Sequence, residues 1–230
     1  MPYTINPLDS FLDTAIKKYS ESIDPSGLLT FTYLKNNEEY QDLISLRFRS
    51  YIASNTLKIN PTLNYFEDIY DKKSIIILAN YQGKIIGAER VTFLEEHDES
   101  LCYRYIKGNS SYPTLAEMTE ASRLCVDPNM QGHSIGYKLE TLAILTSYYS
   151  KKRYLIGAAA GKLIQFHNNI GFKALGVTFS YPDFINFNHE VLLADSHEII
   201  NGQGVRNRIY RTIFLPAFDA FQGCNDLLNQ

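Results

Sequence analysis

The stretch that decides the fold is EASRLCVDPNMQGHSIGYKLE, residues 120–140. It opens like a strand, turns at Asp127-Pro128, and continues into a helical pattern whose first turn is rich in glycine, with Gly132 and Gly136. A helix N-terminus leaves about four backbone N–H groups unpaired and carries a partial positive charge. A glycine-lined entry to such a helix can hold a phosphate; the alternative interpretation is a merely tight connection.

The composition of the chain excludes several classes of protein. A length of 230 residues with 45% hydrophobic and 20% charged residues indicates a globular protein with a sizeable core. The net charge of −3 gives no overall basic field, so we expect no nucleic acid partner. Cys102, Cys125 and Cys224 lack the spacing of a zinc site or a disulfide framework, which predicts reduced thiols, no metal and a cytoplasmic protein. No apolar run approaches the ~18 residues of a transmembrane segment.

The residue pattern predicts strands and helices in mixed order. Apolar residues at helical spacing between Leu8 and Tyr19 predict an amphipathic helix. Two β-branched runs around Gln82-Gly83 predict a hairpin over 74–94. Further strands are expected at 28–35, 101–107, 118–127, 153–160, 172–181 and 189–195, and further helices at 36–57, 135–151 and 162–170.

This order of elements, without an internal repeat, predicts an α/β (α+β) sheet domain. We expect a single domain over 1–230, with an N-terminal helical extension at 1–27 and a C-terminal extension at 205–230. Pro216 argues against one continuous helix in the last thirty residues.

The glycine turn resembles motif A of the GNAT acyltransferase superfamily. In that motif a strand ending in Val-Asp-Pro leads through an Arg/Gln-x-x-Gly-x-Gly/Ala turn into a helix. The stretch LCVDPNMQGHSIGYKLE is similar, with Gln131 and Gly136 in place and Ser134 where Gly is usual. Serine has a narrower φ range than glycine, yet we expect Ser134 to sit in the first helical turn without strain.

A second stretch, FHNNIGF at 166–172, resembles the superfamily's Phe-Tyr-x-x-x-Gly-Phe run. His167 stands where the family usually has a Tyr that protonates the departing thiolate. An imidazole that titrates near neutrality is a plausible acid at this position. The alternative is that His167 only packs beside Phe166 in a short helix.

The resemblance implies a mixed central sheet splayed between two parallel strands, with helices on both faces and an acyl thioester in the opening. It implies that one of these strands, 120–126, holds the pantetheine arm and offers an N–H to the oxyanion. The expected donor-binding residues are Leu124, Cys125, Val126, Gln131, Gly132, His133, Ser134, Ile135 and Gly136. An attacking amine must lose a proton, and Glu120 is the expected base.

Four polar motifs narrow the resemblance to the branch of acyl-homoserine-lactone synthases and long-chain N-acyl amino acid synthases. They are LRFRSYI, FEDIYDKKS, GKIIGAER and TEASRLCV, in this order. The branch is marked by an early Arg, an Asp-x-x-Asp pair, a Gly-x-x-Arg and a Glu-x-x-Arg. The matching positions are Arg47, Asp68, Asp71, Arg90, Glu120 and Arg123.

This constellation suits an amino acid acceptor, because its ammonium group needs carboxylates and its carboxylate needs a guanidinium. The expected acceptor-binding residues are Arg47, Asp68, Asp71 and Arg90. Structural ion pairing between the N-terminal helices and the sheet is an equal alternative for the first three. We favour a catalytic role for Glu120 and Arg123, with His167 as the candidate acid.

The resemblance implies an N-acyltransferase that moves a medium or long fatty acyl group from acyl carrier protein or acyl-CoA to an amino acid or similar amine. The alternative enzyme hypothesis is an acyl-homoserine-lactone synthase that uses S-adenosylmethionine. Such synthases usually carry a Trp after the early Arg, and this chain has none. Two more hypotheses are an acetyl-CoA-dependent N-acetyltransferase and a non-enzymatic acyl-thioester-binding module.

An acidic acyl carrier protein requires a basic patch near the pantetheine entrance. The basic residues available near the helix are Lys138, Lys151, Lys152 and Arg153. The alternative for the last three is that they only solvate and cap the C-terminal end of the helix.

Overall fold

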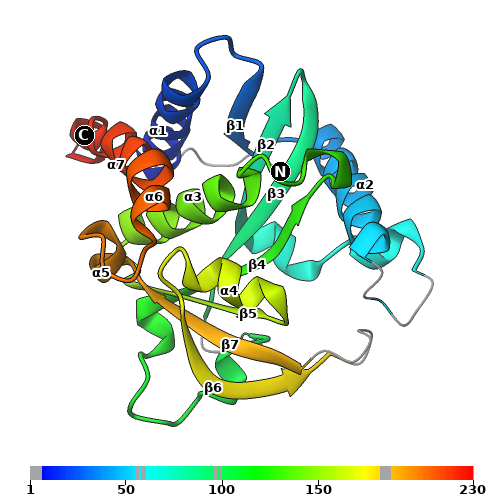
Figure 1. Cartoon of the computed structure of the whole chain (residues 1–230), viewed down its shortest axis with the longest axis vertical. Coiled ribbons are helices and arrows are strands. Elements are labelled where there is room, and N and C mark those ends of the chain that lie inside the picture. Colours follow the sequence, from blue (N-terminus) through cyan, green and yellow to red (C-terminus); the bar gives the residue numbers. More distant parts are fainter. Residues whose placement is uncertain are drawn as a thin grey trace.

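The computed structural model describes residues 7–54, 57, 61–95, 98, 100–181 and 188–229. Within these ranges seven strands form one mixed sheet (Figure 1). The strands are β1 (Leu29–Tyr33), β2 (Ser74–Tyr81), β3 (Lys84–Phe93), β4 (Met118–Val126), β5 (Tyr154–Ala159), β6 (Lys173–Ser180) and β7 (Asn188–Asp195). They lie in the order β1-β2-β3-β4-β5-β7-β6, and only β4 and β5 of these pair in parallel.

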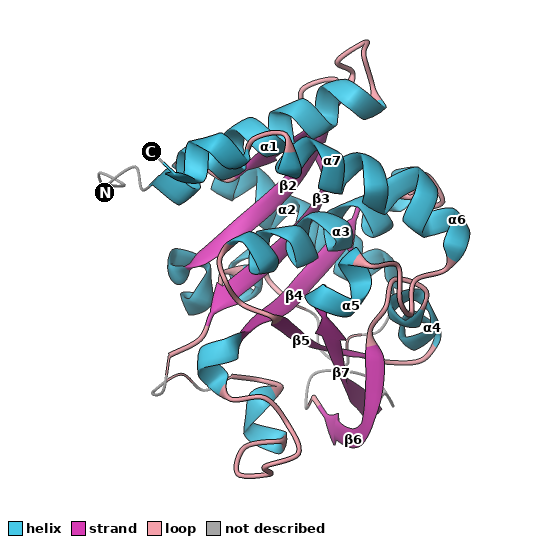
Figure 2. Ribbon diagram, turned by 90° about the vertical axis from the view of Figure 1, so that its left-hand side faces the viewer, coloured by secondary structure: helices cyan, strands magenta, loops and turns pink. Residues whose placement is uncertain are grey.

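Helices cover both faces of this sheet, as expected from the sequence. They are α1 (Pro7–Ile23), α2 (Asn37–Ser54), α3 (Ile135–Tyr149), α4 (Lys162–Asn168), α5 (Ser196–Ile200), α6 (Asn207–Ile209) and α7 (Leu215–Gln222). Figure 2 shows α1, α3 and α7 in front of the sheet and α2 behind it. None of the helices in the described ranges is long and apolar enough to cross a lipid bilayer.

The core is divided by the sheet. The largest apolar cluster joins α1, α3 and α7 to one face, through side chains such as Leu142 and Phe221. A second cluster joins α2 to the other face, where Leu43 and Leu46 meet Ala88 and Cys125. Residues on alternate positions of β3 and β4 therefore point into different layers, as the two-residue period of a strand requires.

The terminal segments pack against each other beside α3. The ring of Phe11 on α1 lies 5.9 Å from that of Phe221 on α7 and 4.9 Å from that of Tyr149 on α3. Phe11 and Phe221 are both fully buried. The N-terminal and C-terminal helices thus contribute to the main core rather than standing apart from it.

The strand predicted at 101–107 is wrong. This segment forms turns and a short 3₁₀ helix, Tyr103–Tyr105, because the Ser100 hydroxyl accepts hydrogen bonds from the backbone N–H groups of Cys102 and Tyr103. Cys102 and Ile106 are its buried side chains, a spacing of four that suits a helical turn rather than an alternating strand.

The expectation for Pro216 also needs correction. The backbone stays helical from Asn207 to Gln222, with a π-helical segment, Tyr210–Phe214, between α6 and α7. A proline inside an α-helix lacks an N–H and clashes with the carbonyl four residues earlier. The wider π turn directly before Pro216 accommodates both defects, so the helix continues.

Truncation of a buried α3 side chain is expected to destabilise the protein strongly. Leu142 is 0% exposed, so Leu142→Ala should lower the free energy of unfolding by about 2–5 kcal/mol. Leu28→Ala is the matched control. Because Leu28 is 44% exposed, this substitution should lower the free energy of unfolding by less than about 0.5 kcal/mol. Urea unfolding followed by circular dichroism measures both, and equal losses would contradict this account of the core.

Candidate active site

The two parallel strands separate after a short paired segment. Pairing joins Met118–Glu120 of β4 to Tyr154–Ile156 of β5 and goes no further. On their outer sides, β4 pairs with β3 as far as Val126, and β5 pairs with β7 as far as Ala159. The inner edges of both strands therefore face a gap. Buried backbone groups at such edges require a partner, and an extended ligand with amide groups can supply one.

A β-bulge in β4 lies at the gap. Ala88 pairs with Cys125 and Arg90 with Ser122, so one residue of β3 opposes two of β4. Arg123, in the bulge, has φ of 60°, the left-handed conformation that is rare for residues other than glycine. Such a bulge bends the strand and leaves one residue out of the ladder. It places both Ser122 and Arg123 toward the α2 side of the sheet, where they bond to Arg90 and Asp68.

One cavity of about 540 Å³ passes through this gap. Its walls come from both layers: Tyr51 of α2 lines it, and so do Leu163 and Phe166 of α4. Among the predicted donor-binding residues, the cavity is lined by Leu124, Cys125, Val126, Gln131 and Gly136. Of the predicted catalytic residues, Glu120, Arg123 and His167 all line it. The volume lies within the range of small-molecule sites, about 300–1,000 Å³.

Glu120 is held in the wall of this cavity. It is 3% exposed, and its Oε2 accepts hydrogen bonds from the Ser100 hydroxyl and, at 3.2 Å, from the backbone N–H of Cys102. Burial raises the pKa of Glu120, and these two hydrogen bonds and the charge of Arg90 oppose the increase without cancelling it. A carboxyl group whose pKa is raised toward neutrality is better suited to general base chemistry than an ordinary one.

The other acidic and basic motif residues form a buried ion-pair network. Asp71 binds Arg47 through two bonds of 2.6 and 3.0 Å, and its Oδ1 lies 3.2 Å from Nη1 of Arg90. Oδ2 of Asp68 binds Arg90 at 2.8 Å and Arg123 at 2.9 Å. The side chains of Arg47 and Arg90 are 1% exposed and that of Asp71 is 3% exposed.

Three guanidinium groups and two carboxylates leave this network with one net positive charge. Burial raises the pKa of Asp68, but the charges of Arg90 and Arg123 outweigh it and lower the pKa to about 2. The structure thus brings all the predicted acceptor residues together. It places Arg47, Asp68, Asp71 and Arg90 behind the cavity wall, since none of them lines the cavity.

The glycine turn opens onto a second cavity, of about 480 Å³. Gly132 and Ser134 line it, together with Lys138 of α3 and two arginines near α6, Arg206 and Arg208. His133 is exposed and Ile135 is buried, and neither lines the cavity. Ile135 packs on Gly87, where an added Cβ would lie 2.9 Å from its Cγ2.

The basic residues near the turn differ from those expected. Of the four predicted, only Lys138 lies there, because α3 separates it from Lys151, Lys152 and Arg153. The ammonium group of Lys152 bonds the backbone oxygen of Ala116, and Arg153 pairs with Asp195 at 2.7 Å. The cations that join Lys138 come from the C-terminal segment, which only tertiary folding brings to the turn.

Ser134 does not sit without strain, contrary to expectation. Its φ and ψ are 60° and 14°, a left-handed conformation, and its side chain makes no capping bond. That conformation costs a non-glycine residue about 1–2 kcal/mol. It turns the chain sharply between Gly132 and the first turn of α3, in a conformation that glycine would adopt without this cost.

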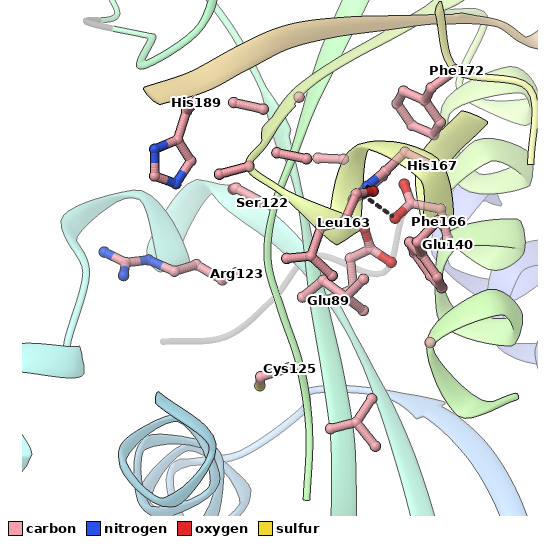
Figure 3. Close-up of a pocket in the computed structure, with 18 of the residues that line it drawn as sticks. Glu89, Ser122, Arg123, Cys125, Glu140, Leu163, Phe166, His167, Phe172 and His189 are labelled. Atoms are coloured by element: carbon pink, nitrogen blue, oxygen red, sulfur yellow. Dashed lines mark hydrogen bonds and ion pairs between the residues drawn. The ribbon is translucent and has the colours of Figure 1, made fainter. Parts of the chain in front are cut away.

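His167 lies at the cavity wall beside two carboxyl groups that sequence reasoning missed. Its Nε2 is 3.3 Å from Oε2 of Glu140 on α3, and Glu89 of β3 lies next to Glu140 (Figure 3). In Figure 3 these three side chains gather on one side of the cavity, whereas Arg123 points away from them. A single charged residue inside the apolar run LETLAIL, 139–145, was the sequence signal for Glu140.

The described residues contain no group of His, Cys, Asp and Glu side chains placed to hold a metal ion. The three cysteines are free thiols and are buried. Burial raises the pKa of Cys125 to about 11, so its thiol stays protonated at neutral pH.

No protein-family model and no curated protein matches the sequence. The structure is similar to FeeM, an N-acyl amino acid synthase from uncultured soil microbes, with a TM-score of 0.62, 12% identity, and coverage of 76% of this chain and 94% of that one. It is also similar to MesI, a CoA-dependent acyl-homoserine lactone synthase, with a TM-score of 0.53, 18% identity, and coverage of 84% of this chain and 95% of that one. A third similar structure is a putative GNAT-family acetyltransferase from Desulfovibrio desulfuricans, with a TM-score of 0.54, 10% identity, and coverage of 73% of this chain and 99% of that one. The chain has the GNAT fold, which confirms the fold class expected from the sequence.

Removal of one buried charge from the network is expected to destabilise the protein. Asp71→Asn leaves Arg47 and Arg90 without a full counter-charge, which should cost about 3–5 kcal/mol of unfolding free energy. The control is Asp13→Asn, because Asp13 and Lys35 form an exposed pair, 41% and 57% accessible, worth at most about 1 kcal/mol. Urea unfolding of both variants measures the difference. A loss for Asp71→Asn no larger than that of the control would contradict a structural role for the network.

Proposed function

We propose that this chain is an N-acyltransferase that moves a medium or long fatty acyl group from a pantetheine thioester to the α-amino group of an amino acid or similar amine. The observation that carries the proposal is the cavity that passes through the strand gap. Glu120 lies in one wall of this cavity, and the first turn of α3 and His167 lie in the other. The fold shared with FeeM and MesI supports it, since both are acyl synthases by name.

The donor is expected to enter from the α3 side. Its pantetheine amides would pair with the inner edge of β4 at Leu124–Val126, in the manner of an added strand. Its phosphate would meet Gly132 and Ser134 at the N-terminus of α3, where backbone N–H groups and the helix dipole favour an anion. Lys138, Arg206 and Arg208 supply positive charge there. Acyl carrier protein and CoA both present such a phosphate.

The acceptor amine is expected on the α2 side, next to Glu120 and Arg123. An amino acid reaches the site as an ammonium ion, which must lose a proton before its nitrogen can attack. Glu120 can take that proton because burial raises its pKa. The guanidinium of Arg123, whose side chain is 23% exposed, lies in the same cavity and can pair with the acceptor carboxylate.

In the chemical step the amine nitrogen attacks the thioester carbonyl carbon, and a backbone N–H at the inner edge of β4 would stabilise the oxyanion. The C–N bond forms, the C–S bond breaks, and sulfur leaves with the electron pair and takes a proton. The overall change converts a thioester and an ammonium ion into an amide, a thiol and one released proton. The cytoplasm, where thioesters and reduced thiols occur together, is the compartment we expect.

Product analysis tests the proposal. The purified protein would be incubated with acyl carrier protein and CoA thioesters of several chain lengths, pooled amino acids and S-adenosylmethionine, and the products identified by mass spectrometry. An N-acyl amino acid from a long-chain donor is the expected result. A lactone would identify a homoserine-lactone synthase instead, and product from acetyl-CoA alone would identify an acetyltransferase. Donor binding without any product would indicate a thioester-binding module.

Glu120→Gln is expected to lower kcat at least about a hundredfold, because the amide cannot accept the ammonium proton. Donor binding should change less than about twofold, since Glu120 lies away from the glycine turn. Steady-state kinetics and donor titration measure the two effects. Glu21→Gln, on the exposed face of α1, controls for the substitution. Turnover that survives in Glu120→Gln would exclude Glu120 as the base.

The double variant Arg206→Ala/Arg208→Ala is expected to raise the KM for the donor about tenfold with little change in kcat, because charge-assisted bonds to phosphate hold the donor in ground and transition states alike. Arg211→Ala is the control, since Arg211 is exposed nearby but does not line the second cavity. If both variants show the same KM, the arginines do not bind the donor.

A further inference from the structure

Two buried carboxyl groups have no part in the chemistry proposed above. Glu89 on β3 is 1% exposed and Glu140 on α3 is 0% exposed, and both line the cavity that contains Glu120. With both groups ionised, Oε2 of Glu89 and both carboxyl oxygens of Glu140 accept no hydrogen bond from a protein donor among the described residues. A buried carboxylate is costly unless it is paired with a cation or takes up a proton.

His167 is the basic group that faces Glu140. Its Nδ1 is 2.7 Å from the backbone oxygen of Leu163, and a carbonyl oxygen only accepts, so Nδ1 carries a hydrogen. Its Nε2 faces the Glu140 carboxylate at 3.3 Å. A second hydrogen on Nε2 makes the ring an imidazolium. Burial lowers the pKa of His167, but the charge and close approach of the Glu140 carboxylate, together with the hydrogen bond to Leu163, outweigh burial and raise it.

Glu89 is the neutral member of the group. Burial raises its pKa well above the ordinary value, and the charge of Glu140 and a hydrogen bond to the Glu140 carboxyl raise it further. Two carboxyl groups bond to each other only when one carries a proton. A protonated Glu89, a Glu140 carboxylate and a His167 imidazolium have no net charge, which explains how the core accommodates them.

Among the described residues, few other charged side chains lie near Glu89, Glu140 and His167. On β4, the thiol of Cys125 acts weakly on Glu89, and β5 contributes residues 157–159, which do not ionise. The rings of Phe166 and Phe172 lie 5.0 and 5.3 Å from the His167 ring. The other ionisable groups that line the cavity are Glu120 and Arg123 on β4, Tyr51, Cys102, Tyr181 and His189. Glu140 is thus the charged group in direct contact with His167.

We propose that Glu89 and Glu140 are positioning residues that hold His167 as an imidazolium, so that its Nε2 proton passes to the thiolate released in acyl transfer. The proposal rests on the acyltransferase function given above. Nδ1 is occupied by Leu163, so Nε2 is the nitrogen through which the proton moves. The ammonium of the acceptor loses two protons in becoming an amide: one replaces the proton given to sulfur, and the other passes to solvent.

The first test follows the histidine directly and needs no turnover. NMR titration of the five histidines, with His167→Gln to assign the resonance, measures the pKa of His167. It should be above the ordinary value in the wild type and lower in Glu140→Gln, which removes the counter-charge. In Glu89→Gln the pKa of His167 should equal the wild-type value, because the glutamine amide donates a hydrogen bond to Glu140 as a protonated carboxyl group does. The His197 resonance, remote from the cavity, is the internal reference.

The second test measures the pH dependence of turnover. Because the acid must be protonated, kcat should fall as pH rises through the His167 pKa, and this decrease should start at lower pH in Glu140→Gln. At pH 8 that variant should lose at least about tenfold in kcat with a KM within about twofold of the wild type. Glu21→Gln should follow the wild-type profile.

The outcomes separate the two proposals. An unchanged His167 titration in Glu140→Gln, or a shifted one in Glu89→Gln, overturns the assignment of charges even if the protein makes product. A shifted titration together with an unchanged pH profile overturns the proton transfer to sulfur. Absence of product with every donor overturns the proposed function and this use of His167 with it, whereas the NMR result on the three side chains stands independently.

Discussion

The rest of the structure depends on the early end of one strand pairing. β4 and β5 are joined over only three residues each, and beyond that point each strand is bonded on its outer side alone. The interior of a protein does not tolerate unpaired backbone edges without a partner. The gap is therefore the part of the sheet whose inner edges lack a strand partner, and the cavity described above passes through it. The bulge at Arg123 bends β4 directly beyond the last residue that pairs with β5.

The ion-pair network supports this strained segment. Asp68 binds the guanidinium of Arg123, which has a positive φ, and Arg90 bonds both Asp68 and the hydroxyl of Ser122. Arg47 and Asp71 extend the same network beneath α2. Arg47, Asp68, Asp71 and Arg90 thus stabilise the bulge from the side away from the cavity. Of the motif residues, Glu120 and Arg123 line the cavity. Under the proposed function, structural and chemical roles would be divided along the motif rather than shared equally.

The two sides of the sheet solve the problem of buried charge differently. On the α2 side, fixed guanidinium charges compensate carboxylates and lower the pKa of Asp68. On the α3 side, Glu89 and Glu140 pair with no guanidinium group among the described residues, and we infer that a proton shared between the two carboxyl groups compensates Glu89. The first arrangement keeps its charges over a wide pH range. The second includes groups that can exchange a proton, and the proton transfer proposed above depends on this property.

The sequence by itself determined the α/β fold class, the hairpin and the glycine turn, because hydrophobic period and turn chemistry are local properties. The motif residues were identified by their resemblance to a known family. The sequence predicted a strand at 101–107 where a serine hydroxyl stabilises a turn, and it placed basic residues at the wrong end of α3. Only the tertiary structure decided which motif residues reach the cavity, that Arg206 and Arg208 join the glycine turn, and that Glu89, Glu140 and His167 meet. These contacts join segments tens of residues apart in the chain, and their energies depend on burial, which no local pattern specifies.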